Sequence, residues 1–167
     1  MSLRKILAAM VLLGAGAAQA ADAPFLWEVS GARNKHYLMG SVHMLPESAY
    51  PLPPALDTAY AAADALVLET DIAALTSPQL QAQMLSAGAS PSGLKNEIGA
   101  PLYQRVQDYA HAHGIPGQLC DAFKAWFCSL TLEVLSFQQT GSRPDLGLDQ
   151  HYYMQALAAR KAVLWLE

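Results

Sequence analysis

Two short apolar runs, each ending in a residue that can bind a metal or move a proton, constrain the fold of this chain most strongly. The first is YLMGSVH at residues 37–43, and the second is ALVLE at residues 65–69. Apolar runs of this length are typical of buried parallel strands with polar residues at their carboxyl ends. A proline-rich loop and a helix at residues 55–63 separate them, in the order of a βαβ unit. We therefore expect the two strands to lie side by side, with His43 and Glu69 at the same edge of the sheet.

The amino-terminal segment has the pattern of a secretory signal peptide. A basic pair precedes an apolar run at residues 6–17, and an A-x-A pattern follows at residues 18–20. We predict cleavage before Ala21 and a periplasmic or secreted protein, in which residues 1–20 are the signal peptide and residues 21–167 form one domain. An uncleaved anchor is the alternative, but the run is short for a bilayer, and no later segment predicts a transmembrane helix.

The charge of the chain bears on its partners. The 167 residues include 10 basic and 14 acidic side chains, a formal charge of −4. Residues 1–20 contain two of the basic residues and no acidic one, so cleavage leaves 8 basic against 14 acidic residues, or −6. Such an acidic surface argues against nucleic acid as a partner.

Two cysteines, Cys120 and Cys128, would enter an oxidising compartment, where pairing is open to them. Residues 121–138 are apolar on nearly all faces and predict one buried helix. If both cysteines lie on that helix, eight residues at ~1.5 Å per residue place them ~12 Å apart, too far for a disulfide. We expect two buried thiols, unless Cys120 lies in the loop before the helix.

The remaining segments predict short strands and helices around these runs. Alternating β-forming residues at 25–29 and 36–43 predict a hairpin, and residues 88–99 read as a loop. Apolar stripes and capping residues predict helices at residues 79–87, 101–113 and 148–160, and a last strand at residues 162–167. The fold class we expect is α/β, a small mixed sheet with flanking helices.

Several motifs together resemble the TraB/GumN family, which is related to the Tiki metalloproteases. They are Gly40-Ser-Val-His43, the proline-rich loop, Leu68-Glu-Thr-Asp71, Gly147-Leu-Asp149 and Val163-Leu-Trp-Leu-Glu167, in order along essentially all of the mature chain. The resemblance implies a metal-dependent hydrolase or peptidase with an erythromycin-esterase-like (EreA/ChaN-like) α/β fold. In that family a second Gly-x-x-His motif follows in the carboxyl-terminal half. This sequence lacks it, as a chain ending just past the midpoint would, so we expect an incomplete fold and an incomplete site.

Histidine and carboxylate side chains are the candidates for a site that binds zinc, manganese or cobalt. His43 and Glu69 are also the candidate catalytic residues. Ordinary structural roles are the alternatives, since His43 could bond a neighbouring carbonyl and Asp149 could cap the helix that it opens. The candidate metal ligands are His43, Glu69, Asp149 and Glu167.

Gly40 and Ser41, just before His43, could let a ligand or a loop backbone approach closely. Ser41 lacks the Gly-x-Ser-x-Gly pattern of a serine nucleophile. We expect a metal-dependent hydrolase in which metal-bound water attacks the carbonyl of a peptide or a similar amide or ester. The alternative is a non-enzymatic periplasmic binding or assembly module with the same fold. Residues 162–167 would form an uncovered apolar strand, through which we expect self-association.

Overall fold

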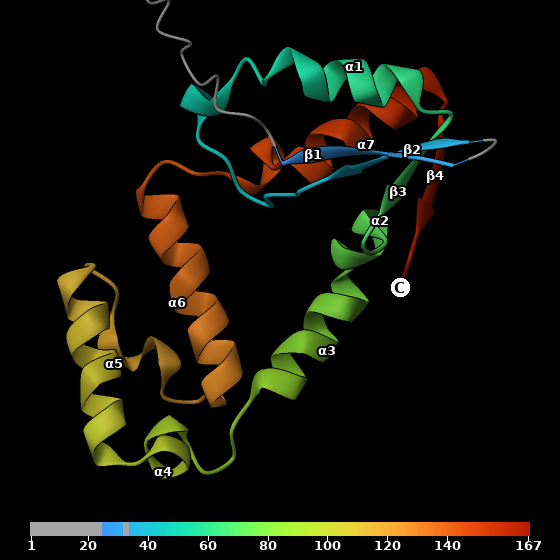
Figure 1. The fold of residues 1–167 in the computed structure, drawn as a ribbon. Coiled ribbons are helices and arrows are strands. Elements are labelled where there is room, and N and C mark those ends of the chain that lie inside the picture. Colours follow the sequence, from blue (N-terminus) through green and yellow to red (C-terminus); the bar gives the residue numbers. More distant parts are fainter. Residues whose placement is uncertain (1–24, 32–33) are drawn as a thin grey trace, which may run out of the picture.

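The computed structural model describes residues 25–31 and 34–167. The predicted signal peptide, residues 1–20, lies outside the described residues. Within the part that is described, no helix is long and apolar enough to cross a membrane. The protein is mixed α/β, and its elements form two parts, one that holds the strands and one that is helical (Figure 1).

Among the described residues, the strands form two small sheets of two strands each. β1 (Leu26–Ser30) pairs antiparallel with β2 (Lys35–Met39), which confirms the predicted hairpin. β3 (Ala65–Leu68) pairs parallel with β4 (Ala162–Trp165), with Leu66 opposite Val163. The predicted pairing of residues 36–43 with residues 65–69 in one mixed sheet is therefore wrong.

The parallel partner of β3 comes from the far end of the chain because helix α7 (Leu148–Ala159) leads directly into β4 and packs against both strands. Parallel strands need a crossover of this kind, usually a helix. The predicted crossover helix, α1 (Pro54–Ala62), packs against β2 instead. β2 also ends at Met39, so His43 follows the strand in a loop and does not end it.

The strand-bearing part has its own hydrophobic core. The buried residues come from the proline-rich loop, α1 and α7, and partly buried residues of β1, β2 and β3 pack against them. The four buried members are Leu52, Leu56, Leu148 and Tyr152. This core therefore fixes α7 and the loop after β2 relative to each other, although they are far apart in the sequence.

Capping side chains mark the starts of α2 and α3. Asp71 accepts hydrogen bonds from the amides of Ala73 and Ala74 at 2.9 and 3.2 Å, and Ser77 accepts one from Leu80 at 3.2 Å. The helices between β3 and α7 are α2 (Ile72–Leu75), α3 (Pro78–Gly88), α4 (Leu94–Ile98), α5 (Ala100–Ala112) and α6 (Ala125–Gln139).

The short helix α4 lies inside the segment predicted to be a loop, so that prediction is wrong. Gly93 and Gly99 bracket the helix, and both have a φ of +79°, which residues with a Cβ rarely adopt. The chain also forms short 3₁₀ helices, which are η3 (Glu47–Ala49), η4 (Gly117–Cys120) and η5 (Pro144–Leu146).

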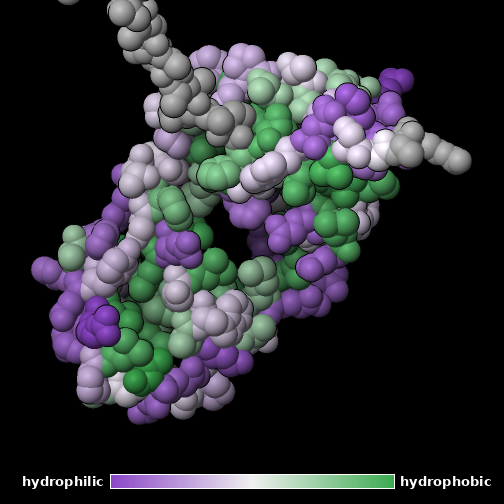
Figure 2. Space-filling view, in the orientation of Figure 1, coloured by the Kyte–Doolittle hydropathy of each residue, from purple (hydrophilic) through white to green (hydrophobic). Residues whose placement is uncertain are grey.

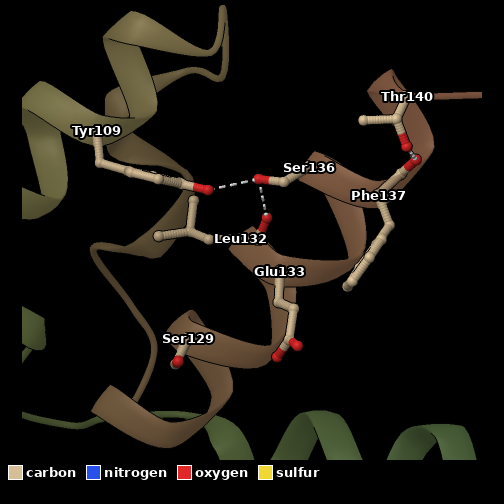
Figure 3. Close-up of a pocket in the computed structure, with 7 residues that line it drawn as sticks. All are labelled: Tyr109, Ser129, Leu132, Glu133, Ser136, Phe137 and Thr140. Carbon is tan, nitrogen blue, oxygen red and sulfur yellow. Dashed lines mark hydrogen bonds between the residues drawn. The ribbon is translucent and has the colours of Figure 1, made fainter.

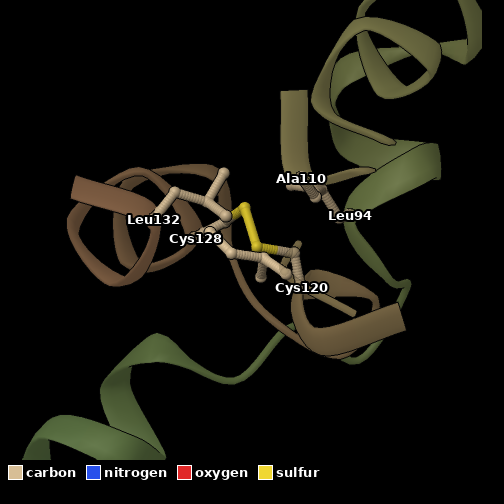
Figure 4. Packing of buried hydrophobic residues seen from close by; sticks show 6 residues of the cluster. Leu94, Ala110, Cys120, Cys128 and Leu132 are labelled. Atoms are coloured by element: carbon tan, nitrogen blue, oxygen red, sulfur yellow. A yellow bond between two sulfur atoms is a disulfide. The ribbon is translucent and has the colours of Figure 1, made fainter. Parts of the chain in front are cut away.

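Cys120 and Cys128 form a disulfide, with their Cα atoms 5.2 Å apart, so the expectation of two thiols is wrong. The predicted helix began at residue 121, whereas α6 begins at Ala125, and Cys120 lies in η4 before it. Cys120 therefore lies before the helix, which is the alternative that the sequence left open. The disulfide lies in a buried cluster of the helical part with Leu94, Ala110 and Leu132 (Figure 4).

Helix α6 is not buried on all faces, as its sequence predicted. Its buried residues are Cys128 and Leu132, whereas Trp126, Leu130 and Phe137 are 47%, 40% and 47% exposed. Hydrophobic residues lie on the surface of both parts in the view of Figure 2.

Candidate functional site

One cavity, of about 490 Å³, brings together residues from four separate segments. The segments are the loop after β2, the end of β3 together with α2, η5 together with the first turn of α7, and the chain that follows β4. A volume of this size is in the range of small-molecule sites. The histidine and carboxylate residues in its lining are His43, Glu69, Asp149 and Glu167.

His43 and Asp149 are in direct contact, with His43 Nδ1 2.8 Å from Asp149 Oδ2. The His43 side chain is 68% exposed and that of Asp149 is 21% exposed. Asp149 does not cap α7, because Gly147 holds the N-cap position and no side chain bonds the first amides of the helix. The alternative role of Asp149 as a helix cap is therefore not seen in the structure.

Backbone contacts hold the loop of His43 against the start of α7. Leu45 and Arg143 exchange two backbone hydrogen bonds, of 3.2 and 3.0 Å, and the amide of Leu148 donates to the carbonyl of Val42 at 2.9 Å. Gly147 lies so close to the His43 carbonyl that a Cβ there would overlap it. Sequence reasoning missed this role of Gly147, although a glycine directly before a helix start was a visible signal.

Glu69 and Glu167 approach the cavity from the carboxyl ends of two paired strands. Glu69 directly follows β3, and the amide of Glu167 donates to the carbonyl of Glu69 at 3.2 Å, beyond the end of β4. Ends of parallel strands meet at one edge of a sheet, where α/β proteins bind ligands. His43 thus shares a cavity with Glu69 although their strands are not neighbours.

The chemistry of these side chains fits a divalent metal, but they lie farther apart than the ligands of one bound ion. Histidine with carboxylates suits zinc, manganese or cobalt. Among residues 25–31 and 34–167, however, no group of three or more histidine, cysteine, aspartate or glutamate side chains is close enough to hold an ion. The cavity thus offers a bonded His43–Asp149 pair and two separate carboxylates.

Gly40 and Ser41 lie outside the lining of this cavity. The amide of Gly40 donates to the carbonyl of Phe25 at 2.7 Å, and a Cβ on Gly40 would lie 2.9 Å from the Cβ of Phe25. The close approach at Gly40 is therefore made by Phe25, just before β1. Thr70 and Gln150, which were not predicted to be site residues, also line the cavity.

A second cavity, of about 540 Å³, lies between α5 and α6. Tyr109 of α5 reaches across it to Ser136 of α6, with 2.7 Å between their hydroxyl oxygens (Figure 3). Its lining contains one carboxylate, Glu133, and no histidine. It therefore has fewer groups that can carry chemistry than the cavity at His43.

Comparison with known proteins adds to this geometry. The chain is 28% identical over 135 residues to the uncharacterized protein YbaP of Escherichia coli strain K12, covering 80% of this chain and 49% of that protein. It is also 28% identical over 137 residues to the uncharacterized protein YbaP of Shigella flexneri, covering 82% of this chain and 49% of that protein. The chain thus spans about half the length of the curated relatives it matches. No solved structure matches it. The family profile described as TraB/PrgY/gumN matches residues 25–167, and the chain therefore belongs to the TraB/PrgY/gumN family.

Proposed function

We propose that the cavity at His43 is the site of a metal-dependent hydrolase that acts on a peptide or a similar amide or ester. The observation that carries the proposal is that His43, Asp149, Glu69 and Glu167, from four separate segments, line one cavity. We also propose that the two parts of the molecule belong to an erythromycin-esterase-like α/β fold, and that the protein works in the periplasm or outside the cell.

The roles follow from the chemistry of each side chain. The proposed donors are His43, Glu69 and Glu167, with Asp149 bonded to His43, and a divalent ion held there would polarise the substrate carbonyl and acidify a bound water. In this proposal Glu69, exposed at the end of β3 and lining the cavity, would accept a proton from the attacking water. Thr70 and Gln150 offer hydrogen bonds to a substrate amide.

Apolar side chains complete the cavity. Ile72 and Leu75 of α2 line it beside the carboxylates, and apolar walls with a few polar groups are typical of sites that bind small ligands. These two residues would contact a substrate side chain next to the bond that is cleaved.

A non-enzymatic binding module is the second candidate function. It is favoured by one observation, that no three metal-donor side chains in the described part of the chain lie together. A catalytic metal usually has about three protein ligands and one open position. A site that is incomplete in this chain would bind an ion weakly and hydrolyse slowly.

Metal titration separates the two candidates. Purified protein would be titrated with Mn²⁺, Co²⁺ or Zn²⁺ singly, and peptide hydrolysis measured at each metal concentration. Under the hydrolase proposal, His43→Ala and Glu69→Gln each weaken metal binding at least about tenfold, as expected for groups at a metal site. His111→Ala, which removes an exposed histidine on α5, is the control and should leave binding unchanged. Absence of binding in the unaltered chain would favour the binding module.

A further inference from the structure

We infer that Asp149 is a positioning residue for His43, which fixes the tautomer of the imidazole and directs Nε2 to the cavity, and that Asp149 is not itself a metal ligand. The inference deepens the proposed function and rests on it for the use of the cavity. The structural part, the effect of Asp149 on His43, stands on the contacts alone.

The hydrogen bond assigns the protons of the ring. An ionised carboxylate can only accept hydrogen bonds, so the 2.8 Å contact of Asp149 Oδ2 with His43 Nδ1 requires the proton on Nδ1. A neutral imidazole carries one N–H, which leaves Nε2 with a free lone pair. Nε2 makes no hydrogen bond to any of the described residues, and His43 lines the cavity.

The same bond separates Asp149 from an ion bound at Nε2. The two ring nitrogens point away from each other, so a carboxylate bonded at Nδ1 lies on the side of the ring opposite to a ligand of Nε2. Asp149 cannot keep its bond and also coordinate that ion. Metal-binding histidines commonly donate their second N–H to a carboxylate in this way.

The position of Asp149 is set by the backbone around it. It lies in the first turn of α7, where the helix N-terminus favours a negative charge. The backbone bonds between residues 42–45 and 143–148 hold the two loops together. Asp149 Oδ1 is enclosed and has no partner among the described residues, so His43 is the one polar side chain that the carboxylate contacts there. The loop of His43 and the first turn of α7 thus hold His43 and Asp149 in contact.

The tautomer of His43 tests the inference without a metal. In ¹⁵N-labelled, metal-free protein at alkaline pH, two-bond ¹H–¹⁵N correlation spectra distinguish Nδ1–H from Nε2–H rings. We expect His43 to be in the Nδ1–H form, and Asp149→Ala to shift it towards the Nε2–H form, which a free ring prefers in water. Asp145→Ala is the matched control, because it removes an exposed carboxylate bonded to Arg143 outside the cavity lining.

A His43 ring in the Nε2–H form in the unaltered protein would overturn the inference, and this result needs no variant to fold. An unchanged tautomer in a folded Asp149→Ala variant would overturn it as well.

Zn²⁺ titration of the same proteins distinguishes this inference from the proposed function. We expect Asp149→Ala to weaken Zn²⁺ binding about 10- to 100-fold, as loss of such a partner does, and equal affinities would overturn the positioning role. If the unaltered protein bound no Zn²⁺ but showed the expected tautomers, the proposed metal site would fail and the effect of Asp149 on His43 would be supported.

Discussion

At the scale of single residues, Tyr152 links the stability of the protein to pH. It is 2% exposed, and its hydroxyl donates to Asp57 Oδ1 at 3.0 Å. Burial, and then the bond to Asp57, raises the pKa of Tyr152 above its ordinary value of 10.0. The folded state therefore favours the neutral phenol, whereas the unfolded chain ionises first as pH rises. Stability from this group is complete below about pH 10 and is lost as pH rises further.

Replacing Tyr152 by phenylalanine tests this linkage. Tyr152→Phe should lower the free energy of unfolding by about 1 kcal/mol near neutral pH, because a buried hydrogen bond is lost. It should also make the decline in stability above about pH 10 less steep. Urea unfolding at a series of pH values measures both effects. Tyr109→Phe, which removes a phenol from a 41% exposed residue, is the control, and an equally flattened profile in that variant would contradict the assignment.

Gly147 is a second residue whose substitution has a defined consequence. A Cβ at this position would overlap the carbonyl of His43, and backbone cannot move aside as a side chain can. Gly147→Ala should therefore cost about 1–3 kcal/mol of unfolding free energy, a usual cost of overpacking, and should separate His43 from Asp149. In Gly117→Ala the new Cβ meets the end of the Gln107 side chain, which can rotate away. Equal costs for the two variants in urea unfolding would refute this reading.

At the scale of elements, local signals predicted most of the longer helices and the β1–β2 hairpin, but not the short helix α4 or the partner of β3. Helices α3 and α5 begin within one residue of the predicted starts, because Ser77 and two prolines mark them. The partner of β3 was not predictable in this way. Parallel pairing depends on which distant apolar segment packs beside β3, and the order of a βαβ unit pointed to the run at residues 37–43.

In the candidate site, too, features set by neighbouring residues were predictable from the sequence, and contacts between distant segments were not. His43 and Glu69 were singled out because each follows an apolar run, a local pattern. The hydrogen bond from His43 to Asp149 joins residues 106 positions apart, and it depends on the docking of Gly147 and Leu148 against the loop after β2. The disulfide was missed for a smaller reason, the start of α6 four residues later than predicted.

The disulfide joins two elements, and its removal should destabilise the helical part. Cys120 and Cys128 are separated by 8 positions, and closing a loop of that length constrains the unfolded chain by about 2.5 kcal/mol in the chain-entropy model. The Cys120→Ala/Cys128→Ala variant should lose about that much unfolding free energy in urea. The unaltered protein, unfolded with and without reductant, provides the comparison. A variant as stable as the oxidised protein would show that the bond contributes nothing.

At the scale of the whole molecule, the sheet of β3 and β4 has one uncovered apolar face. Leu66 packs on the core beside α7. Successive side chains of a strand point to opposite faces, so the neighbouring pair Val67 and Leu164, which lie opposite each other, faces away from that core. Both are more than half exposed, at 52% and 55%. Parallel strands are normally covered on both faces, and two strands alone are a marginal sheet.

This uncovered face underlies our last prediction, that the chain self-associates through β4. Leu164→Lys should shift sedimentation velocity profiles towards the monomer at protein concentrations where the unaltered chain forms larger species, because a charge on this face opposes its burial in an interface. Leu102→Lys introduces the same charge on α5, at a residue that is 44% exposed, and should leave association unchanged. A chain that is monomeric throughout, or one that responds equally to both substitutions, would exclude β4 as the contact surface.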